Sequence, residues 1–251
     1  MILYRKEMFN VYKTQSMKKF NGEKDVNPHF SKHNINVKKH MMVCGMTGSG
    51  KSNFIVNLLS QMSDTFKHIY IFTKMPNEPI YQMLKEKLGD DLTLARIEEV
   101  PNPDELKSVG QSLCIFDDFL AESSNIFKKL VEYAIVTRKK YFSCVYLTQN
   151  YYSVPKILRE QCTYLALLSM TDKRNLSLIV STLSIDVDAS TIKRIIANAT
   201  KNPLNICLID IRNRDLNKKF RRNWSDFYIL EDKNGEPLNT ITLYGGSGLL
   251  N

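Results

Sequence analysis

Gly45-Met46-Thr47-Gly48-Ser49-Gly50-Lys51-Ser52 decides the fold, because it has the G-x-x-x-x-G-K-S spacing of a phosphate-binding loop. The apolar run 41–44 before it is typical of a buried strand, and apolar residues at helical spacing follow it over 53–59. A strand, a glycine-rich loop and a helix in this order are the context that the motif requires. The stretch therefore predicts a nucleotide site rather than a chance match in a glycine-rich turn.

The residue types in the loop indicate how it would hold ATP. Glycines let the backbone curl so that its N–H groups face the phosphate oxygens, and the helix that starts near Ser52 adds the positive end of its dipole. Lys51 is expected to reach the β- and γ-phosphates, and the Ser52 hydroxyl to take one coordination position on Mg²⁺. The predicted nucleotide contacts are Gly45, Met46, Thr47, Gly48, Ser49, Gly50, Lys51, Ser52 and Asn53.

A pair of acids follows the apolar run 112–116. Asp117 and Asp118 stand where nucleoside triphosphatases carry the Mg²⁺-side partner of the phosphate loop. Asp117 is expected to hold the metal, through a water molecule, and Asp118 to orient or deprotonate the attacking water. An Asp-Asp helix cap or turn is the alternative interpretation.

Two further side chains are candidates for the hydrolytic step. Gln149 ends the apolar run 143–148, and its amide could contact both the γ-phosphate and the attacking water, because it donates and accepts. A turn residue bonded to its own backbone is the alternative. Arg138 closes a predicted helix, and arginine commonly supplies transition-state charge in phosphoryl transfer, often from a neighbouring subunit. Capping of the helix C-terminus explains Arg138 equally well, and Arg159 and Arg174 are weaker alternatives.

Strands that alternate with helices predict an α/β fold with a mostly parallel sheet covered by helices on both faces. Strands are expected at 41–44, 68–73, 92–97, 112–116, 143–148, 163–169 and 204–211. Helices are expected from 52 onward, at 80–88, after Asp104, and at 125–139, 154–161, 176–184 and 190–200. Beyond Arg222 the pattern fades, and the aromatic residues at 224, 227 and 228 predict only a short packed end segment.

Charge suggests how the 251 residues are organised. The net charge is +9, and basic residues gather in the first forty positions and in a cluster at 212–222. We expect residues 1–38 to be a basic N-terminal arm with short elements, 39–222 the core and 223–251 a C-terminal extension. A basic balance favours a polyanionic partner, although the arm could equally be a solvated tail.

Cysteines and apolar runs bear on the compartment. The five cysteines lie in or beside apolar runs without metal-ligand spacing, which favours reduced, buried thiols. No apolar run approaches the length of about 20 residues that a membrane-spanning helix needs. The N-terminus lacks the apolar core of a signal peptide, so we expect the protein to stay on the side of the membrane where it is made.

Several motifs in order carry a resemblance to a known family. They are the loop with Asn53-Phe54, then Ile115-Phe116-Asp117-Asp118-Phe119, Thr137-Arg138-Lys139-Lys140-Tyr141, and Tyr146-Leu147-Thr148-Gln149-Asn150 with the Val154-Pro155-Lys156…Arg159 helix. Over roughly residues 40–212, the chain resembles the FtsK/HerA class of DNA-pumping ATPases. Within that class it is similar to the poxvirus-type genome-packaging ATPases of large DNA viruses and virophages.

The resemblance implies a RecA-like (ASCE) P-loop core and ATP-driven packaging of double-stranded DNA into a preformed capsid. It implies a homo-oligomeric ring, a pentamer or hexamer, with capsid or portal vertex proteins as partners. It also implies a location in the host cytoplasm or viral factory, or in the virion. By position, Lys51, Ser52, Asp117 and Gln149 match the nucleotide, metal and sensor residues of the family, and Arg138 matches a residue acting in trans. Many members have Glu at the position of Asp118, whose shorter side chain would hold the water differently.

Other functions remain open on the sequence alone. A monomeric nucleotide switch or a kinase would also carry the loop, although residues 74–110 do not resemble a kinase lid. Another DNA-pumping or helicase-like ATPase is a third reading. A structural nucleic-acid-binding protein with a vestigial loop is a fourth, and it predicts that loss of Lys51 would leave DNA handling intact.

Overall fold

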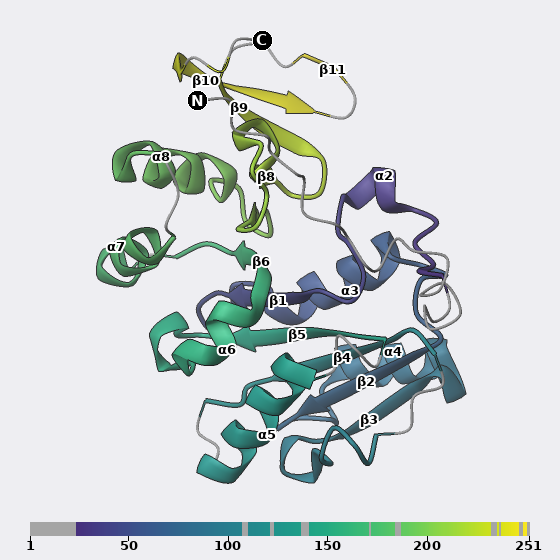
Figure 1. Ribbon diagram of the computed structural model, residues 1–251. Coiled ribbons are helices and arrows are strands. Elements are labelled where there is room, and N and C mark those ends of the chain that lie inside the picture. The colour runs from purple at the N-terminus through teal and green to yellow at the C-terminus, as the bar shows by residue number, and fades with distance from the viewer. Residues whose placement is uncertain are drawn as a thin grey trace, which may run out of the picture.

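A computed structural model describes residues 24–106, 110–120, 123–136, 141–170, 172–183, 187–231, 235, 237–245 and 248–249 of the chain. Figure 1 shows a single twisted sheet that runs through the molecule, with helices packed on it. Its strand order is β11-β10-β9-β8-β7-β6-β1-β5-β4-β2-β3. The first 23 residues of the predicted N-terminal arm lie outside the described residues, and the rest of the arm contains α2 (Phe30–His33).

Parallel strands form the half of the sheet that ends in β3. They are β1 (His40–Cys44), β2 (His68–Thr73), β3 (Leu92–Arg96), β4 (Ser112–Asp117), β5 (Phe142–Thr148) and β6 (Cys162–Leu167). Each neighbouring pair is parallel, and β1 lies between β5 and β6. Their continuous apolar runs suit strands that are covered on both faces, so the predicted parallel α/β core is confirmed.

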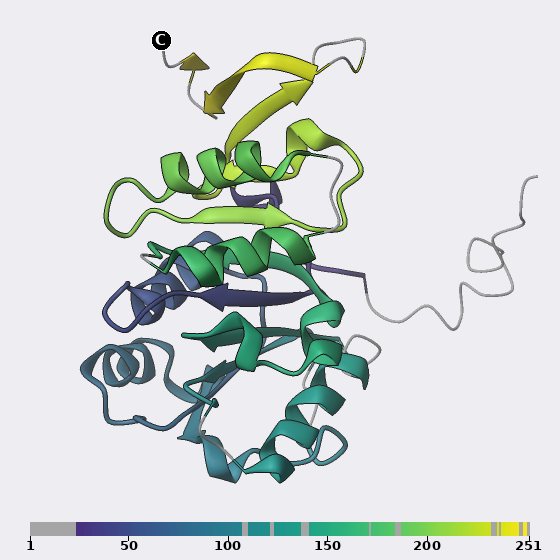
Figure 2. The ribbon, with the colours of Figure 1, turned by 90° about the vertical axis from the view of Figure 1, so that its left-hand side faces the viewer.

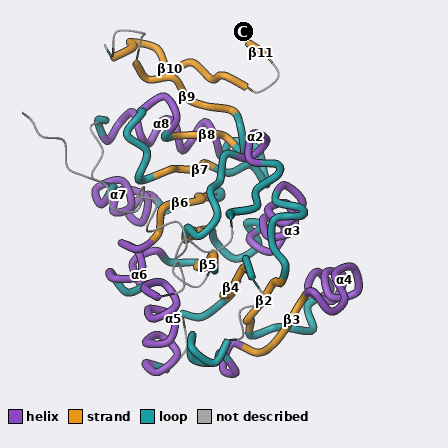
Figure 3. The backbone as a smooth tube through the Cα atoms, turned by 45° about the vertical axis from the view of Figure 1, so that its right-hand side comes forward, coloured by secondary structure: helices purple, strands orange, loops and turns teal. Residues whose placement is uncertain are grey.

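Helices cover both faces of this half. On one face lie α3 (Lys51–Gln61) and α4 (Pro79–Leu88), and on the other lie α5 (Ser124–Val136), α6 (Lys156–Gln161) and α7 (Lys173–Thr182). Next to α7, α8 (Ala189–Ala199) continues this layer along the sheet beyond β6. Figure 3 shows α3 and α4 on the opposite side of the strands from α5, α6 and α7. Figure 2 turns the layer that contains α7 and α8 toward the viewer.

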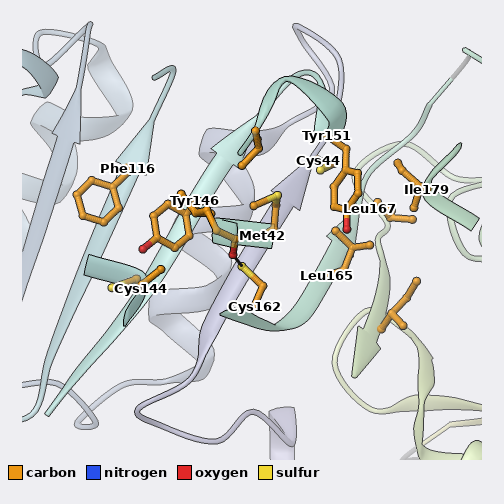
Figure 4. Packing of buried hydrophobic residues seen from close by; sticks show 14 of the residues in the cluster. Met42, Cys44, Phe116, Cys144, Tyr146, Tyr151, Cys162, Leu165, Leu167 and Ile179 are labelled. Carbon is orange, nitrogen blue, oxygen red and sulfur yellow. Dashed lines mark hydrogen bonds between the residues drawn. The ribbon is translucent and has the colours of Figure 1, made fainter. Parts of the chain in front are cut away.

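Apolar side chains from neighbouring strands fill the space beneath the helices. Figure 4 shows Met42, Tyr146 and Cys162 of adjacent strands side by side, with Tyr151 and Ile179 packed nearby. All five cysteines are buried free thiols. Among the described residues, no helix is long and apolar enough to cross a bilayer.

An antiparallel half continues the sheet beyond β6. It consists of β7 (Cys207–Asp210), β8 (Phe220–Arg222), β9 (Asp226–Glu231), β10 (Pro237–Gly245) and β11 (Gly248–Leu249). The prediction of only a short packed end segment after Arg222 was therefore wrong. The strands β8 and β9 pair across the predicted boundary at 222/223, through Arg222 and Asp226.

Two local predictions were also wrong. Asp104 begins no helix in the described residues, because Glu105 closes a turn by accepting hydrogen bonds from the backbone N–H (2.9 Å) and the side-chain amide (2.7 Å) of Asn102. The last predicted strand starts at Cys207 rather than at 204, because the Asn205 N–H donates to Asn202 O at 3.2 Å and forms a turn there.

Candidate active site

The phosphate loop leaves the sheet between two strand ends. The Gly45 N–H donates to Thr148 O of β5 at 3.1 Å, and the Leu168 N–H, just after β6, donates to Cys44 O at 2.9 Å. These bonds fix the start of the loop at the carboxyl edge of the parallel strands. Ligands of open α/β sheets bind at this edge.

Two glycines are required by the shape of the loop. A Cβ atom on Gly45 would lie 2.3 Å from Ser49 Oγ and 3.0 Å from Leu168 Cβ, so any side chain there would clash with these two residues. Gly50, at the N-cap of α3, has φ of +94°, a left-handed conformation that suits glycine. From there α3 begins, with its free N–H groups pointing toward the loop.

Lys51 lies inside the loop. Its ammonium donates to Gly45 O at 2.9 Å and to Met46 O at 3.0 Å. Burial lowers the pKa of Lys51, while the charges of Asp117 and Asp118 act in the opposite direction. The lysine charge therefore lies within the field of the two acids, as a phosphate-bridging lysine must.

Asp117 is the last residue of β4 and is buried, whereas Asp118 is exposed and has φ of +54°. The Tyr81 hydroxyl of α4 donates to Asp117 Oδ2 at 2.6 Å. Burial raises the pKa of Asp117, and the neighbouring Asp118 adds to this, while Tyr81 and Lys51 oppose it. Asp117 thus needs a cationic or hydrogen-bonding partner to stay ionised.

Tyr81 is a site residue that the sequence did not reveal. The Ser52 side chain lies near its hydroxyl and lowers the pKa of Tyr81, against the larger effects of burial and Asp117, which raise it. Tyr81 is therefore close to both predicted metal ligands, Ser52 and Asp117. Hydroxyl and carboxylate oxygens are donors that suit Mg²⁺, so this pair fits the ion. The only signal for Tyr81 was its place at the start of the helix after β2.

Gln149 faces the loop across the strand ends. Its Oε1 accepts a hydrogen bond from Thr47 Oγ1 at 3.1 Å. Arg138 lies outside the described residues, so its predicted role stays a prediction. Of the two weaker alternatives, Arg159 has its guanidinium carbon 4.9 Å from the ring centres of both Tyr151 and Tyr152, and Arg174 is exposed in the first turn of α7.

A cavity of about 310 Å³ brings most of the predicted residues together. The predicted residues that line it are Thr47, Gly48, Gly50, Lys51, Ser52, Asn53, Asp117, Asp118 and Gln149. Gly45, Met46 and Ser49 form the loop without lining this cavity. Its other walls come from strand ends and the connections after them, including Thr73, Glu78 and Thr148. The arrangement can hold a triphosphate between a cationic loop and a pair of acids.

Known proteins with related sequences are poxviral. The chain is 27% identical to the DNA packaging protein OPG160 of vaccinia virus (strain Copenhagen) over 163 residues, 59% of this chain and 60% of that protein. It is also 27% identical to its monkeypox virus counterpart, over 59% of this chain and 54% of that protein. The chain thus spans about three fifths or less of the length of these relatives.

Solved structures share the fold at low sequence identity. The genome packaging NTPase B204 from Sulfolobus turreted icosahedral virus 2, in complex with ATP-gammaS, has a TM-score of 0.52 at 15% identity. The match covers 75% of this chain and 98% of that one. EssC (ATPases 2 and 3) from Geobacillus thermodenitrificans has a TM-score of 0.50 at 12% identity, over 79% and 41% of the two chains. Both likenesses support the P-loop α/β fold.

The family model of the poxvirus A32 protein matches residues 27–211. This range contains the whole parallel half of the sheet, the phosphate loop, both acids and Gln149. The resemblance inferred from the motifs is thereby confirmed, and the chain belongs to the poxvirus A32 protein family.

Proposed function

We propose that this protein is a Mg²⁺-dependent ATPase whose hydrolysis drives double-stranded DNA into a preformed viral capsid. The observation that carries the proposal is the single cavity in which Lys51 and Ser52 face Asp117, Asp118 and Gln149. The names of the poxviral relatives and of B204 support the packaging role. The kinase and switch alternatives gain no comparable support from a described residue.

Each side chain has a role that follows from its position. The loop N–H groups and Lys51 bind the phosphates and stabilise the charge that develops on the γ-phosphoryl oxygens. Ser52 and Asp117 would hold Mg²⁺, which when bound supplies charge for the β- and γ-oxygens. Asp118 accepts a proton from the attacking water or orients it, and Gln149 places that water beside the γ-phosphate.

Completion of the site depends on neighbouring subunits in this proposal. Arg138 follows α5, and as an arginine supplied in trans it would add positive charge to the transition state. Such a contribution requires a ring, which we propose to be a pentamer or hexamer. Capsid or portal vertex proteins would anchor the ring, in the host cytoplasm or viral factory or in the virion.

The basic cluster at 212–222 is partly open to DNA. Lys219 and Arg221 are buried, whereas Arg212, Arg214 and Lys218 are exposed, although Arg212 donates to Glu160 O at 2.6 Å and Lys218 pairs with Asp215 at 3.1 Å. We propose that basic side chains brought together in the ring grip the DNA phosphates without reading bases.

The test is ATP hydrolysis by the assembled protein with and without duplex DNA, together with its mass in solution. We expect duplex DNA to stimulate turnover and the DNA affinity to fall steeply with salt, because counterions are released on binding. The matched control is the Lys51→Ala variant, which should bind duplex DNA but show no DNA-stimulated ATP hydrolysis. If duplex DNA leaves the rate of ATP hydrolysis unchanged and the protein is a monomer in solution, the switch or kinase alternative would be favoured.

A further inference from the structure

A second pocket lies beside the start of α3, next to the phosphate cavity. It has a volume of about 390 Å³ and is lined by Asn53, Asn57, Leu204, Asn205, Asn223 and Trp224, among others. We call it the asparagine pocket. Asn53 lines both this pocket and the phosphate cavity, so the two hollows meet at the start of α3.

The direction of a bound nucleotide follows from the two hollows. The acids and Gln149 occupy the phosphate cavity, so the γ-phosphate belongs there. The remaining phosphates follow the loop toward the first turn of α3. The nucleoside must then leave the loop on the side away from the acids, where the asparagine pocket opens.

Leu204 connects the pocket to the loop in an unusual conformation. It has φ of +69° and is 59% exposed, although bulky residues rarely adopt left-handed backbone and large apolar side chains favour burial. Its Cδ2 lies 2.7 Å from the place that a Cβ atom on Gly50 would take. Strained residues of this kind cluster at ligand sites, and an exposed leucine beside a phosphate loop offers an apolar surface for a flat ring.

Hydrogen bonds fix the carboxamides of the pocket. The Asn57 amide donates to Asn53 O at 2.9 Å, which turns its oxygen outward as an acceptor. The Asn223 amide donates to Asn205 Oδ1 at 3.2 Å, while Asn223 Oδ1 accepts from the Ile206 N–H at 3.1 Å. Among the described residues, nothing accepts from the Asn205 amide, which is left as a donor.

The aromatic wall is rigid and carries no charge. Trp224 stacks on the buried Phe54, with ring centres 5.5 Å apart and an angle of 27° between the planes. None of the residues that line the asparagine pocket is a carboxylate or a cation. A phosphate or a charged group would gain little there, whereas a neutral base could stack and form hydrogen bonds.

We propose that the asparagine pocket recognises the adenine base of the nucleotide. The Asn57 oxygen accepts from the 6-amino group, and the Asn205 amide donates to a ring nitrogen. A single carboxamide binds adenine through one acceptor and one donor in the same way. Here the acceptor and the donor come from two asparagines. Guanine presents an oxygen at its 6 position, which would face the Asn57 oxygen. The inference rests on the proposed ATP site and adds the residues that select its base.

The experiment measures binding of ATP, GTP and inorganic triphosphate to the full chain by calorimetry. We expect the unaltered protein to prefer ATP over GTP by about 10-fold, the usual worth of one good base contact. Asn57→Ala should remove most of this preference and leave triphosphate affinity unchanged. Ser60→Ala, also exposed on α3 but outside the pocket, is the matched control.

A second variant keeps the test decisive. Asn205→Asp replaces a donor with an acceptor for the guanine N–H groups, so it should shift the preference toward GTP. Triphosphate binding with an unchanged ATP-to-GTP ratio in both variants would overturn the adenine assignment alone. Failure of the unaltered protein to bind triphosphate would instead overturn the proposed function.

Discussion

The two halves of the sheet handle buried charge in different ways. In the parallel half, Asp117 lies at a strand end and faces the phosphate cavity together with Lys51. In the antiparallel half, Arg221 of β8 is only 1% exposed and donates to His33 O at 2.8 Å, Asn34 O at 3.2 Å and Trp224 O at 3.3 Å. Burial is costly for Asp117 and for Arg221, but only Asp117, together with Lys51, faces a cavity that a ligand can enter.

This difference suggests that activity and stability can be separated by substitution. Charges in the parallel half should control turnover, because they surround the place where phosphate binds. Arg221 should control stability, because it joins the segment around α2 to β8 and to the turn that follows it. Each of the following predictions tests one side of that division.

The largest effect is expected for Lys51→Ala. The ammonium stabilises the negative charge on the transferring phosphoryl group most strongly in the transition state. Its removal should therefore lower turnover by about 100- to 1,000-fold or more. Asp117→Ala should behave alike. A steady-state ATPase assay measures the loss, and thermal unfolding should remain nearly unchanged in both variants.

The control for this substitution is Lys193→Ala on α8, outside the cavity, which should hydrolyse ATP normally. A large drop in the melting temperature of Lys51→Ala would contradict the division between the halves. It would mean that the lysine holds the loop together through Gly45 O and Met46 O instead of serving the phosphate.

Arg221→Met should show the converse behaviour. Three backbone carbonyls would lose a buried donor, so we expect the free energy of unfolding to fall by about 2–3 kcal/mol and the melting temperature by several degrees. Binding of triphosphate at a temperature where the variant is folded should be unchanged. Arg194→Met, on the exposed surface of α8, is the control with the same change of side chain. A selective loss of triphosphate binding would break the comparison.

Much of the parallel half could be predicted because its signals are local. The loop motif carries its own spacing, and strands such as β4 and β5 are covered on both faces and so appear as unbroken apolar runs. The carboxyl ends of these strands meet at one edge, so the sequence alone indicates that Asp117 and Gln149 lie near the loop.

The antiparallel half and Tyr81 depend on packing that the sequence does not encode locally. In β9 the buried Tyr228 and Leu230 alternate with the partly exposed Phe227 and Ile229. The apolar run of this strand is only these four residues long, and a run this short is a weak signal for a strand. Tyr81 reaches Asp117 only because α4, which packs mainly on β3, places its tyrosine hydroxyl at the end of β4. The role of Arg221 likewise depends on α2, which lies almost 190 residues earlier in the chain.

Tyr81→Phe sharpens the comparison within the active site. Loss of the hydroxyl removes the 2.6 Å hydrogen bond to Asp117, while the ring keeps its packing. We expect about 10 times more Mg²⁺ to be needed for half-maximal turnover, in the range typical of groups that orient metal ligands. A Mg²⁺ titration of ATPase activity measures the shift, and Tyr244→Phe, at an exposed tyrosine, is the control. An unchanged titration would mean that Asp117 needs no orienting partner.

The smallest effect concerns acid and His33, next to Arg221. His33 is fully buried, and burial together with the charges of Arg221 and His29 lowers its pKa from 6.5 to about 4. Its Nδ1 accepts the Ile35 N–H at 3.0 Å, which a protonated ring cannot do. Below pH 6.5 the unfolded chain takes up a proton that the folded chain refuses until about pH 4, so stability must fall as the pH falls through that window.

Between pH 7 and pH 5.5 the loss attributable to this histidine should be about 1 kcal/mol. Urea unfolding at both pH values measures it, as the difference between the unaltered protein and His33→Gln, since His68 also has a lowered pKa and contributes to the overall slope. His29→Gln, at a partly exposed histidine, should retain most of the pH dependence. If His33→Gln retained the full dependence as well, the pKa of His33 would be the same in the folded and unfolded chains. The surroundings of Arg221 would then accept a second buried charge more readily than the hydrogen bonds of His33 imply.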